Sequence, residues 1–417
     1  MPTAVDIFAG AGGISLGLRN AGWDVVAACD NNPTACATYK ANHPDTCMVQ
    51  GDIQSPQTLD ALVEATRGRR VDLVAIAAPC QPFSSQNRHR HDGDLRQLLI
   101  VQALEVVRRL SPELVLFENV VGLTAKTYRP VIDAVRFELM AQGYVFSGPA
   151  IHDATNYGVP QLRRRCIMLA ARRQSALDLF EAEQPDFPLQ TVRDAIGDLP
   201  ALASGQADPR DPLHRARSHS AIALQRLLAI PKDGGSRSAL PTELRMACHV
   251  DDRSFPDVYG RMAWDEPSMT LTTGCTDVTK GRYAHPEQDR AITAREAARL
   301  QTFPDGYLFV GNGTEISRQI GNAVPPLMIE RLAPVLEAAL LVQAEEAASP
   351  AFASAWFPVT ALHSVPRPMK RQTLAAGTKP VPETERLPAA TRISAYRPML
   401  RGPPFEGLLQ PTKLMVF

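Results

Sequence analysis

The amino-acid sequence predicts an α/β protein with an open, doubly wound sheet, joined to a smaller, loop-rich second domain. Over about the first 170 residues, short apolar runs alternate with longer amphipathic stretches, which is typical of parallel strands connected by helices. After Arg173 this alternation stops, and Pro, Gly, Ser, Asp and Arg interleave with short apolar pieces as far as Gly260. A chain of 417 residues, at about 150 residues per domain, is long enough for two or three domains.

The predicted elements follow one another regularly at first and sparsely later. We expect strands at residues 4–8, 25–29, 71–78, 114–117 and 166–171, and one more that ends near residue 51. We expect helices at residues 15–20, 33–42, 98–110, 130–142, 293–301 and 326–346. These elements divide the chain into an α/β part at 1–173, a loop-rich part at 174–270, a returning part at 271–346 and a Pro-rich, basic extension at 347–417 that offers little apolar surface for packing.

Composition narrows the class of protein. The 44 Lys and Arg side chains balance the 44 Asp and Glu side chains, so any site for a polyanion must be a local patch. The seven cysteines are an odd number scattered along the chain, which argues against a disulfide framework and favours a reducing compartment. The N-terminus has no basic start followed by an apolar run, and no apolar run reaches roughly 18 residues. We therefore expect a cytoplasmic protein that does not enter a membrane.

A glycine-rich turn joins the first predicted strand to the first predicted helix. The segment Phe8 to Gly13 lets the backbone approach a ligand and aims helix N–H groups at it. Ser15 stands where the dinucleotide-binding fingerprint has its third glycine. Asp30 and Asp52 follow the next two strands, where a carboxylate can accept hydrogen bonds from ribose hydroxyls. These residues favour a nucleoside-type cofactor over the alternative, a tight turn with incidental surface acids.

Three polar segments lie next to predicted strands at one expected edge of the sheet. Cys80 follows a strand, where a thiolate can serve as a nucleophile; a buried, inert cysteine is the alternative. Glu118 follows the next strand, where burial of an acid is costly unless it is used or paired; capping of the following turn is the alternative. Arg163 and Arg165 share one face of the last strand and Arg164 takes the other, with a solvated charge run as the alternative.

Taken together, these segments resemble the DNA (cytosine-5) methyltransferases. The resemblance covers about residues 6–334 and follows the motif order of that family, at residues 8–13, 79–81, 118–120, 161–165, 295–305 and 319–326. It implies a Rossmann-like methyltransferase sheet in a catalytic domain made of residues 1–173 and 271–346, with residues 174–270 as the target-recognition domain. No catalytic position departs from the family pattern.

The resemblance also implies roles for the catalytic residues. Cys80 would attack carbon 6 of a cytosine while Glu118 holds ring N3, which makes carbon 5 nucleophilic enough to accept a methyl group. Arg165 would contact the cytosine carbonyl O2, and Arg163 would support the catalytic loop or contact phosphates. Because a base inside a duplex is unreachable, the target must be flipped out, and residues 86–94 have the polarity and the glycine of a mobile lid.

The implied methyl donor is S-adenosyl-L-methionine. The resemblance carries its binding site over to Phe8, Gly10, Gly12, Gly13, Asp30, Asp52, Ile53, Leu99, Asn322 and Val324. The last two residues imply that the late helix returns to pack beside the glycine-rich turn. Asn31 stands where the family often has an aromatic residue that touches adenine. No metal site is expected, because the sequence has no close cysteine pair.

The implied partner is double-stranded DNA, and the protein is expected to act as a monomer. It acts either alone or together with a cognate restriction endonuclease, which would recognise the same DNA site without binding to the methyltransferase. A tRNA cytosine-5 methyltransferase is an alternative with the same chemistry, but the Arg-containing gap of about a hundred residues between Arg173 and Thr272 favours DNA. A catalytically silent DNA-binding homologue is disfavoured by the intact Cys80 and Glu118. A Rossmann oxidoreductase is a third alternative, disfavoured by Ser15.

Overall fold

The structure is a computed structural model that describes residues 1–79, 99–183, 185–246 and 257–348. Contacts divide the chain into two units, Met1–Phe357 and Pro358–Phe417. All described residues lie in the first unit. Cys80, the predicted lid at 86–94 and nearly all of the predicted extension at 347–417 lie outside the described residues. No described helix is both long enough and apolar enough to cross a membrane.

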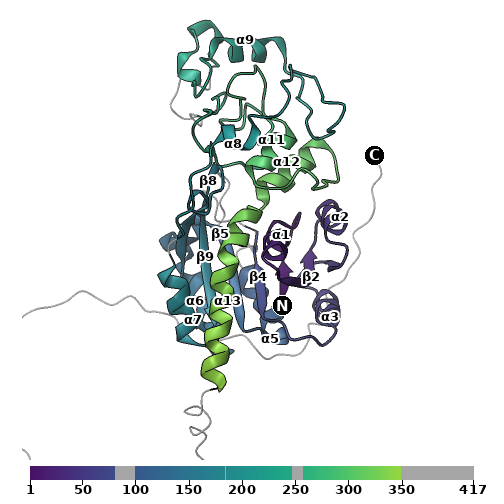
Figure 1. Ribbon diagram of the computed structural model, residues 1–417, viewed down its shortest axis with the longest axis vertical. Helices are drawn as coiled ribbons and strands as arrows, with labels where there is room; N and C mark the ends of the chain where they lie inside the picture. Colours follow the sequence, from purple (N-terminus) through teal and green to yellow (C-terminus); the bar gives the residue numbers. More distant parts are fainter. Residues whose placement is uncertain (80–98, 184, 247–256, 349–417) are drawn as a thin grey trace, which may run out of the picture. The chain divides into compact units, whose positions relative to one another are not determined.

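One large sheet forms the centre of this unit (Figure 1). Its strands follow the order β3-β2-β1-β4-β5-β9-β6, and β7 is also paired to β9. Its strands are β1 Thr3–Ile7, β2 Asp24–Asp30, β3 Cys47–Gln50, β4 Leu73–Ile76, β5 Leu114–Val120, β6 Val145–Phe146, β7 Ala150–Asp153 and β9 Arg164–Ala171. A separate two-stranded sheet joins β8 Gln161–Leu162 to β10 Ser268–Met269. The strands expected in the first part of the chain are confirmed.

The sheet is mixed, which corrects the expectation of a parallel one. Strands β1 to β5 are parallel to one another, whereas β9 runs antiparallel to β5 and also to β6 and β7. A parallel neighbour requires a crossover connection, usually a helix. The chain reaches β9 from β7 through only a short 3₁₀ turn, Ala154–Tyr157, and β8, so it reverses its direction instead.

Helices cover both faces of the sheet, as a doubly wound fold requires. The described helices are α1 Gly13–Asn20, α2 Pro33–Asn42, α3 Pro56–Ala65, α4 Leu99–Gln102, α5 Leu104–Leu110, α6 Arg129–Ala141, α7 Gln174–Ala182, α8 Val192–Ile196, α9 Ala221–Ala229, α11 Ala294–Leu300, α12 Gly313–Asn322 and α13 Pro326–Ala348. The expected helix at 98–110 is divided into α4 and α5. Helices α3, α7, α8, α9 and α12 were not expected.

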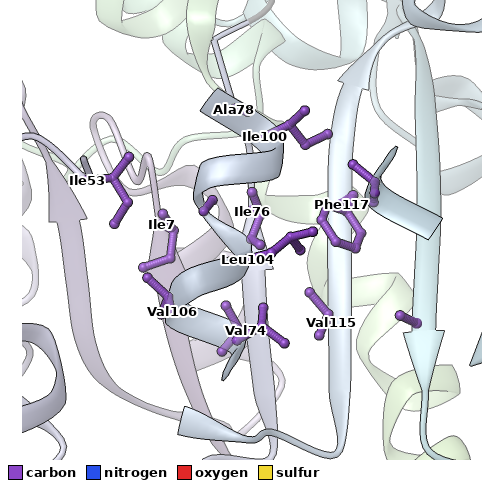
Figure 2. Packing of buried hydrophobic residues seen from close by; sticks show 14 of the residues in the cluster. Ile7, Ile53, Val74, Ile76, Ala78, Ile100, Leu104, Val106, Val115 and Phe117 are labelled. Carbon is purple, nitrogen blue, oxygen red and sulfur yellow. The ribbon is translucent and has the colours of Figure 1, made fainter. Parts of the chain in front are cut away.

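Alternate residues of a strand point into two different cores. Val74 and Ile76 belong to the core beneath α3, α5 and α6, where Figure 2 shows them beside Leu104. Leu73 and Ala75 belong to the core beneath α1, α7 and α13. This alternation follows from the two-residue repeat of a strand and leaves only the ends of the strands free to carry polar groups.

The late helix α13 returns to the start of the chain, as expected. A Cβ atom added to Gly13 would lie 2.3 Å from the carbonyl oxygen of Val324, and one added to Gly17 would lie 2.3 Å from that of Pro326. Only residues without side chains allow the two segments to approach this closely. The glycines of α1 therefore seat the beginning of α13 against the glycine-rich turn.

The later part of the chain builds two further cores. One core joins α8 to α11 and α12 through residues such as Ile196, Leu300 and Ile320, and the other surrounds Leu227 of α9. Helix α7, which the proposed boundary at 173/174 assigns to the target-recognition domain, instead contributes Phe180 to the core of the large sheet. The boundary itself remains a proposal, but α7 packs as a part of the catalytic body.

Candidate active site

The carboxyl end of β5 places an acid beside an arginine of β9. Antiparallel pairing sets Val120 opposite Arg165, so Glu118 and Arg165 are diagonal neighbours on one face. Arg165 Nε lies 2.8 Å from Glu118 Oε1, and each residue is only 9% exposed. An isolated carboxylate would be costly to bury here, and the guanidinium compensates for much of that cost. The edge thus holds a paired, oriented acid with little access to water.

Asn119 ties the same strand end to its parallel neighbour. Its side-chain Nδ2 donates a hydrogen bond of 3.1 Å to the carbonyl oxygen of Ala78, in the segment that leaves β4. This amide is fully buried. Cys80 follows Ala78 by two residues and lies outside the described part of the chain. Asn119 therefore fixes the last described backbone before the predicted nucleophile.

Arg163 is buried and connects distant segments of the chain through hydrogen bonds. Its side chain is 1% exposed, and its guanidinium donates to the carbonyl oxygens of Leu271 at 2.9 Å, Gly321 at 3.0 Å and Ala323 at 2.8 Å. The buried guanidinium is committed to backbone carbonyls, so contact with DNA phosphates, one of the two roles considered for Arg163, does not fit this geometry. Support of the site is the role that we retain as a proposal.

Two buried glutamines extend this cross-link. Gln161 Nε2 donates to Gln301 Oε1 at 2.5 Å, and Gln161 Oε1 accepts from the amide of Leu271 at 3.0 Å. Gln301 Nε2 in turn donates to the carbonyl oxygens of Ile320 and Ala323. Both residues lie in the quoted motifs, yet nothing in the sequence showed that they meet. Their hydrogen bonds hold the strand that carries Arg163 against the segment that follows α12.

The glycine-rich turn uses backbone conformations that favour glycine. Gly10 has φ 55° and Gly12 has φ 94°. The Gly10 amide donates to Asp30 Oδ2 at 2.9 Å, and the Asn32 amide donates to Asp30 Oδ1 at 2.8 Å. Burial raises the pKa of Asp30, and these hydrogen bonds oppose the rise. A Cβ atom on Gly10 would meet nothing within 4 Å, so open space borders the turn.

Behind the turn, a tyrosine and a histidine close the space at Gly12. A Cβ atom on Gly12 would come within 2.6 Å of His43 Nε2 and 2.8 Å of the Tyr307 hydroxyl. That hydroxyl donates to the carbonyl oxygen of Ala11 and lies 3.1 Å from His43 Nε2. Burial lowers the pKa of His43 to about 4, so the ring is neutral near pH 7. Tyr307 was not among the predicted site residues, because no periodic pattern indicates that a residue so far along the chain reaches this turn.

Ser15 has a structural use at the position where a third glycine was considered. Its hydroxyl donates to Asp6 Oδ2 at 2.6 Å and lies 2.7 Å from the hydroxyl of Tyr39. Asp6 is fully buried, and burial raises its pKa to about 7. This hydrogen-bonded group fixes the first turn of α1 beneath the end of β1.

The remaining predicted cofactor residues divide into apolar and polar ones. Phe8 and Leu99 are partly buried and pack against the core that contains Ile53. Asp52 is exposed, and its Oδ1 accepts a hydrogen bond from the amide of Gln54. Asn322 is the exposed last residue of α12. Two further pairs are in contact, as described above: Gly10 with Asp30, and Gly13 with Val324.

The fold and the site together define a class, that of methyltransferases with a mixed, Rossmann-like sheet. A solved structure described as a putative DNA modification methyltransferase encoded within an Escherichia coli prophage has a TM-score of 0.64 and 25% identity, and the match covers 82% of this chain and 100% of that one. The structure of the Schizosaccharomyces pombe Dnmt2 methyltransferase shares the fold, with a TM-score of 0.53 at 19% identity over 83% of this chain and all of that one.

Sequence comparison then identifies the family. The profile of the C-5 cytosine-specific DNA methylases matches residues 3–338. The Type II methylase M.HgiDII of Herpetosiphon aurantiacus is 35% identical over 330 residues, which is 77% of this chain and 91% of that protein. The Type II methyltransferase M1.HphI of Haemophilus parahaemolyticus is 34% identical over 337 residues, 79% of this chain and 85% of that protein. The chain belongs to the C-5 cytosine-specific DNA methylase family and is a DNA cytosine-5 methyltransferase.

Proposed function

We propose that this enzyme methylates carbon 5 of a flipped cytosine in double-stranded DNA, with Cys80 as its covalent nucleophile and S-adenosyl-L-methionine as its methyl donor. The observation that carries the proposal is the nearly buried Glu118–Arg165 pair at the carboxyl edge of the sheet. This edge is where open α/β sheets bind their ligands. Asn119 ties it to the backbone at Ala78, two residues before Cys80.

The residues of the turn fit the proposed methyl donor. The open space at Gly10 admits a ligand close to the backbone. The partly buried Phe8 and Leu99 can contribute apolar contacts to a nucleobase, with Ile53 in the core against which they pack, and the half-buried Asp30 can accept hydrogen bonds from ribose hydroxyls. When bound, S-adenosyl-L-methionine supplies an electrophilic methyl group.

The chain's own residues then activate the base. The Cys80 thiolate forms a bond to carbon 6, and Glu118 donates or shares a proton at ring N3, so that electron density moves to carbon 5. Arg165 holds Glu118 in place through Nε and has further N–H groups that can donate to the carbonyl O2. After methyl transfer, a water molecule takes the carbon 5 proton, and elimination of the Cys80 thiolate with return of the N3 proton to Glu118 restores the aromatic ring. Arg163 supports the site indirectly, because its hydrogen bonds hold Leu271, Gly321 and Ala323 against the strand end.

The setting follows from the substrate. We propose a monomer that acts on DNA in the cytoplasm, and the Type II names of its relatives support a role in restriction and modification. Such a role would place a restriction endonuclease at the same DNA site without requiring the two proteins to bind each other.

A trapping experiment tests the nucleophile. Sequencing of 5-methylcytosine in a plasmid expressed with this gene first identifies the target site. A duplex with 5-fluorocytosine at that site, which blocks loss of the carbon 5 proton, should then give a covalent protein–DNA adduct when S-adenosyl-L-methionine is present. Cys80→Ala should abolish the adduct, whereas Cys47→Ala, which removes an exposed free thiol, should retain it. An adduct formed by Cys80→Ala would reject the assignment.

A further inference from the structure

A large groove lies along the later part of the chain. Its volume is about 1960 Å³, and its lining comes from four stretches: residues 210–217, 257–258, 269–283 and 294–318. Most of the lining therefore comes from outside the predicted target-recognition range 174–270. Seven basic and four acidic side chains line the groove, in a chain whose overall charges balance. The local positive patch that a polyanion requires is present here.

Ion pairs neutralise the acids of the groove. Asp277 pairs with Arg217, Asp257 with Arg282, and Asp211 and Asp305 both pair with Arg295. Arg210 is paired with Asp208. The groove acids are therefore already compensated by arginines that they hold in place.

Three basic side chains of the groove have no ion-pair partner among the described residues. Arg215, Lys280 and Arg318 are exposed and line the groove, and within the described part of the chain they form no hydrogen bond or ion pair through their side chains. Lys280 is nevertheless positioned, because its stem covers Gly274, where a Cβ atom would lie 2.8 Å from Lys280 Cγ. A solvated surface cation needs no such arrangement, whereas a cation that meets a fixed anion benefits from it.

Hydrogen bonds fasten the loop that carries Lys280 to its neighbours. The Tyr283 hydroxyl donates to the carbonyl oxygen of Thr270 at 3.0 Å, and Ser317 Oγ of α12 donates to that of Thr273 at 3.1 Å. Asp277 caps the turn through the Thr279 amide and hydroxyl. Because α12 also carries Arg318, the hydrogen bond from Ser317 links the elements that carry the two cations.

We propose that Arg215, Lys280 and Arg318 bind backbone phosphates of duplex DNA in this groove. The inference rests on the proposed function, because it takes the DNA substrate as the polyanion. Phosphate contacts set the register and orientation of a protein on DNA without reading its sequence. These three residues thus position the duplex, while the recognition of bases is left to other groups of the groove.

The salt dependence of DNA binding tests this proposal. The affinity of the full chain for a fluorescent duplex of random sequence is measured between 50 mM and 300 mM salt, for the wild type and for Arg215→Gln, Lys280→Gln, Arg318→Gln and the triple variant. Each phosphate contact contributes about 0.9 to the slope of log affinity against log salt. The slope should therefore fall by about 0.9 in each single variant and by about 2.7 in the triple variant.

Arg67→Gln is the matched control. Arg67 is exposed and lies between α3 and β4, at the edge where β4 begins, which is opposite to the carboxyl edge. Its removal should leave the slope unchanged. Slopes in the three groove variants that match the wild type, or a fall as large in Arg67→Gln, would overturn the proposal, provided that thermal melts show all variants folded.

Methylation of a plasmid by the same proteins separates this inference from the proposed function. An unchanged methylated site in the variants supports phosphate contacts, and a changed site would overturn them in favour of base contacts. A wild type that binds DNA but never methylates it would contradict the proposed function alone, because the comparison of slopes stays valid.

Discussion

At the scale of single residues, the carboxylate of Glu118 is the group whose role most depends on its surroundings. Its sequence position, after four apolar residues, is equally typical of a helix-capping or turn-capping acid. The structure instead pairs it with Arg165. A carboxyl group held by an arginine at one oxygen can carry its proton on the other oxygen and present that proton to ring N3.

Glu118→Gln should lower single-turnover methylation roughly 10²- to 10⁴-fold, the usual size of a general acid–base contribution. The amide cannot donate a proton to N3 as an acid does, although it fills the same space. The rate is measured well below the melting temperature of both proteins, so that any stability lost with the ion pair does not enter the rate. A normal rate accompanied by a lower melting temperature would leave Glu118 as a structural residue.

At the scale of elements, helix α12 supports both the cross-linked site and the groove. The carbonyl oxygen of Gly321 in this helix accepts a hydrogen bond from Arg163, and Gly321 packs directly on the backbone of Thr272 and Thr273. A Cβ atom at Gly321 would lie 2.2 Å from the carbonyl oxygen of Thr272 and 2.7 Å from the amide nitrogen of Thr273. No side chain fits there unless the loop moves.

Gly321→Ala should therefore destabilise the protein by about 1–3 kcal/mol, the usual cost of overpacking, although alanine is intrinsically the better helix former. Gly313→Ala is the control in the same helix, because a Cβ atom at Gly313 would meet nothing within 4 Å. Urea unfolding compares the two variants. If both were equally stable or more stable than the wild type, the close packing of the loop on α12 would be disproved.

At the scale of the whole molecule, the groove crosses the domain boundaries that the sequence predicts. The loop from Thr272 to Lys280 lies beyond residue 270, whereas α7 lies within 174–270 but packs into the core of the large sheet. We therefore propose that the target is recognised by a surface built from several stretches of the chain, rather than by one continuous segment.

Exchange of residues 185–283 for the corresponding region of a relative with another target should move methylation to the site of that relative. Exchange of residues 174–260 should not do so, because it replaces α7 and leaves the Thr272–Lys280 loop in place. Sequencing of 5-methylcytosine in plasmids that express each chimaera measures the outcome. Full transfer of specificity by the shorter exchange would show that the loop takes no part in target recognition.

Local patterns were sufficient for much of this protein. The strands β1, β2, β4, β5 and β9 and the helices α2, α6 and α13 were predicted, because apolar periodicity and the punctuation by Gly and Pro are properties of neighbouring residues. The sequence also determined which residue types stand at the strand ends, and the order of its motifs was enough to indicate the family that the profile comparison confirms. The chemistry proposed for Glu118 could be predicted because it depends on the residue type at a strand end and on the order of the motifs.

Tertiary structure alone decided how these pieces meet. The antiparallel direction of β9 depends on a connection too short for a crossover, and the burial of Arg163 depends on Leu271, Gly321 and Ala323, each more than 100 positions away. The pairing of Tyr307 with the glycine-rich turn is equally remote. Such contacts arise when the chain closes long loops to bury its cores, and the local residue pattern does not record which distant partner completes a buried polar group.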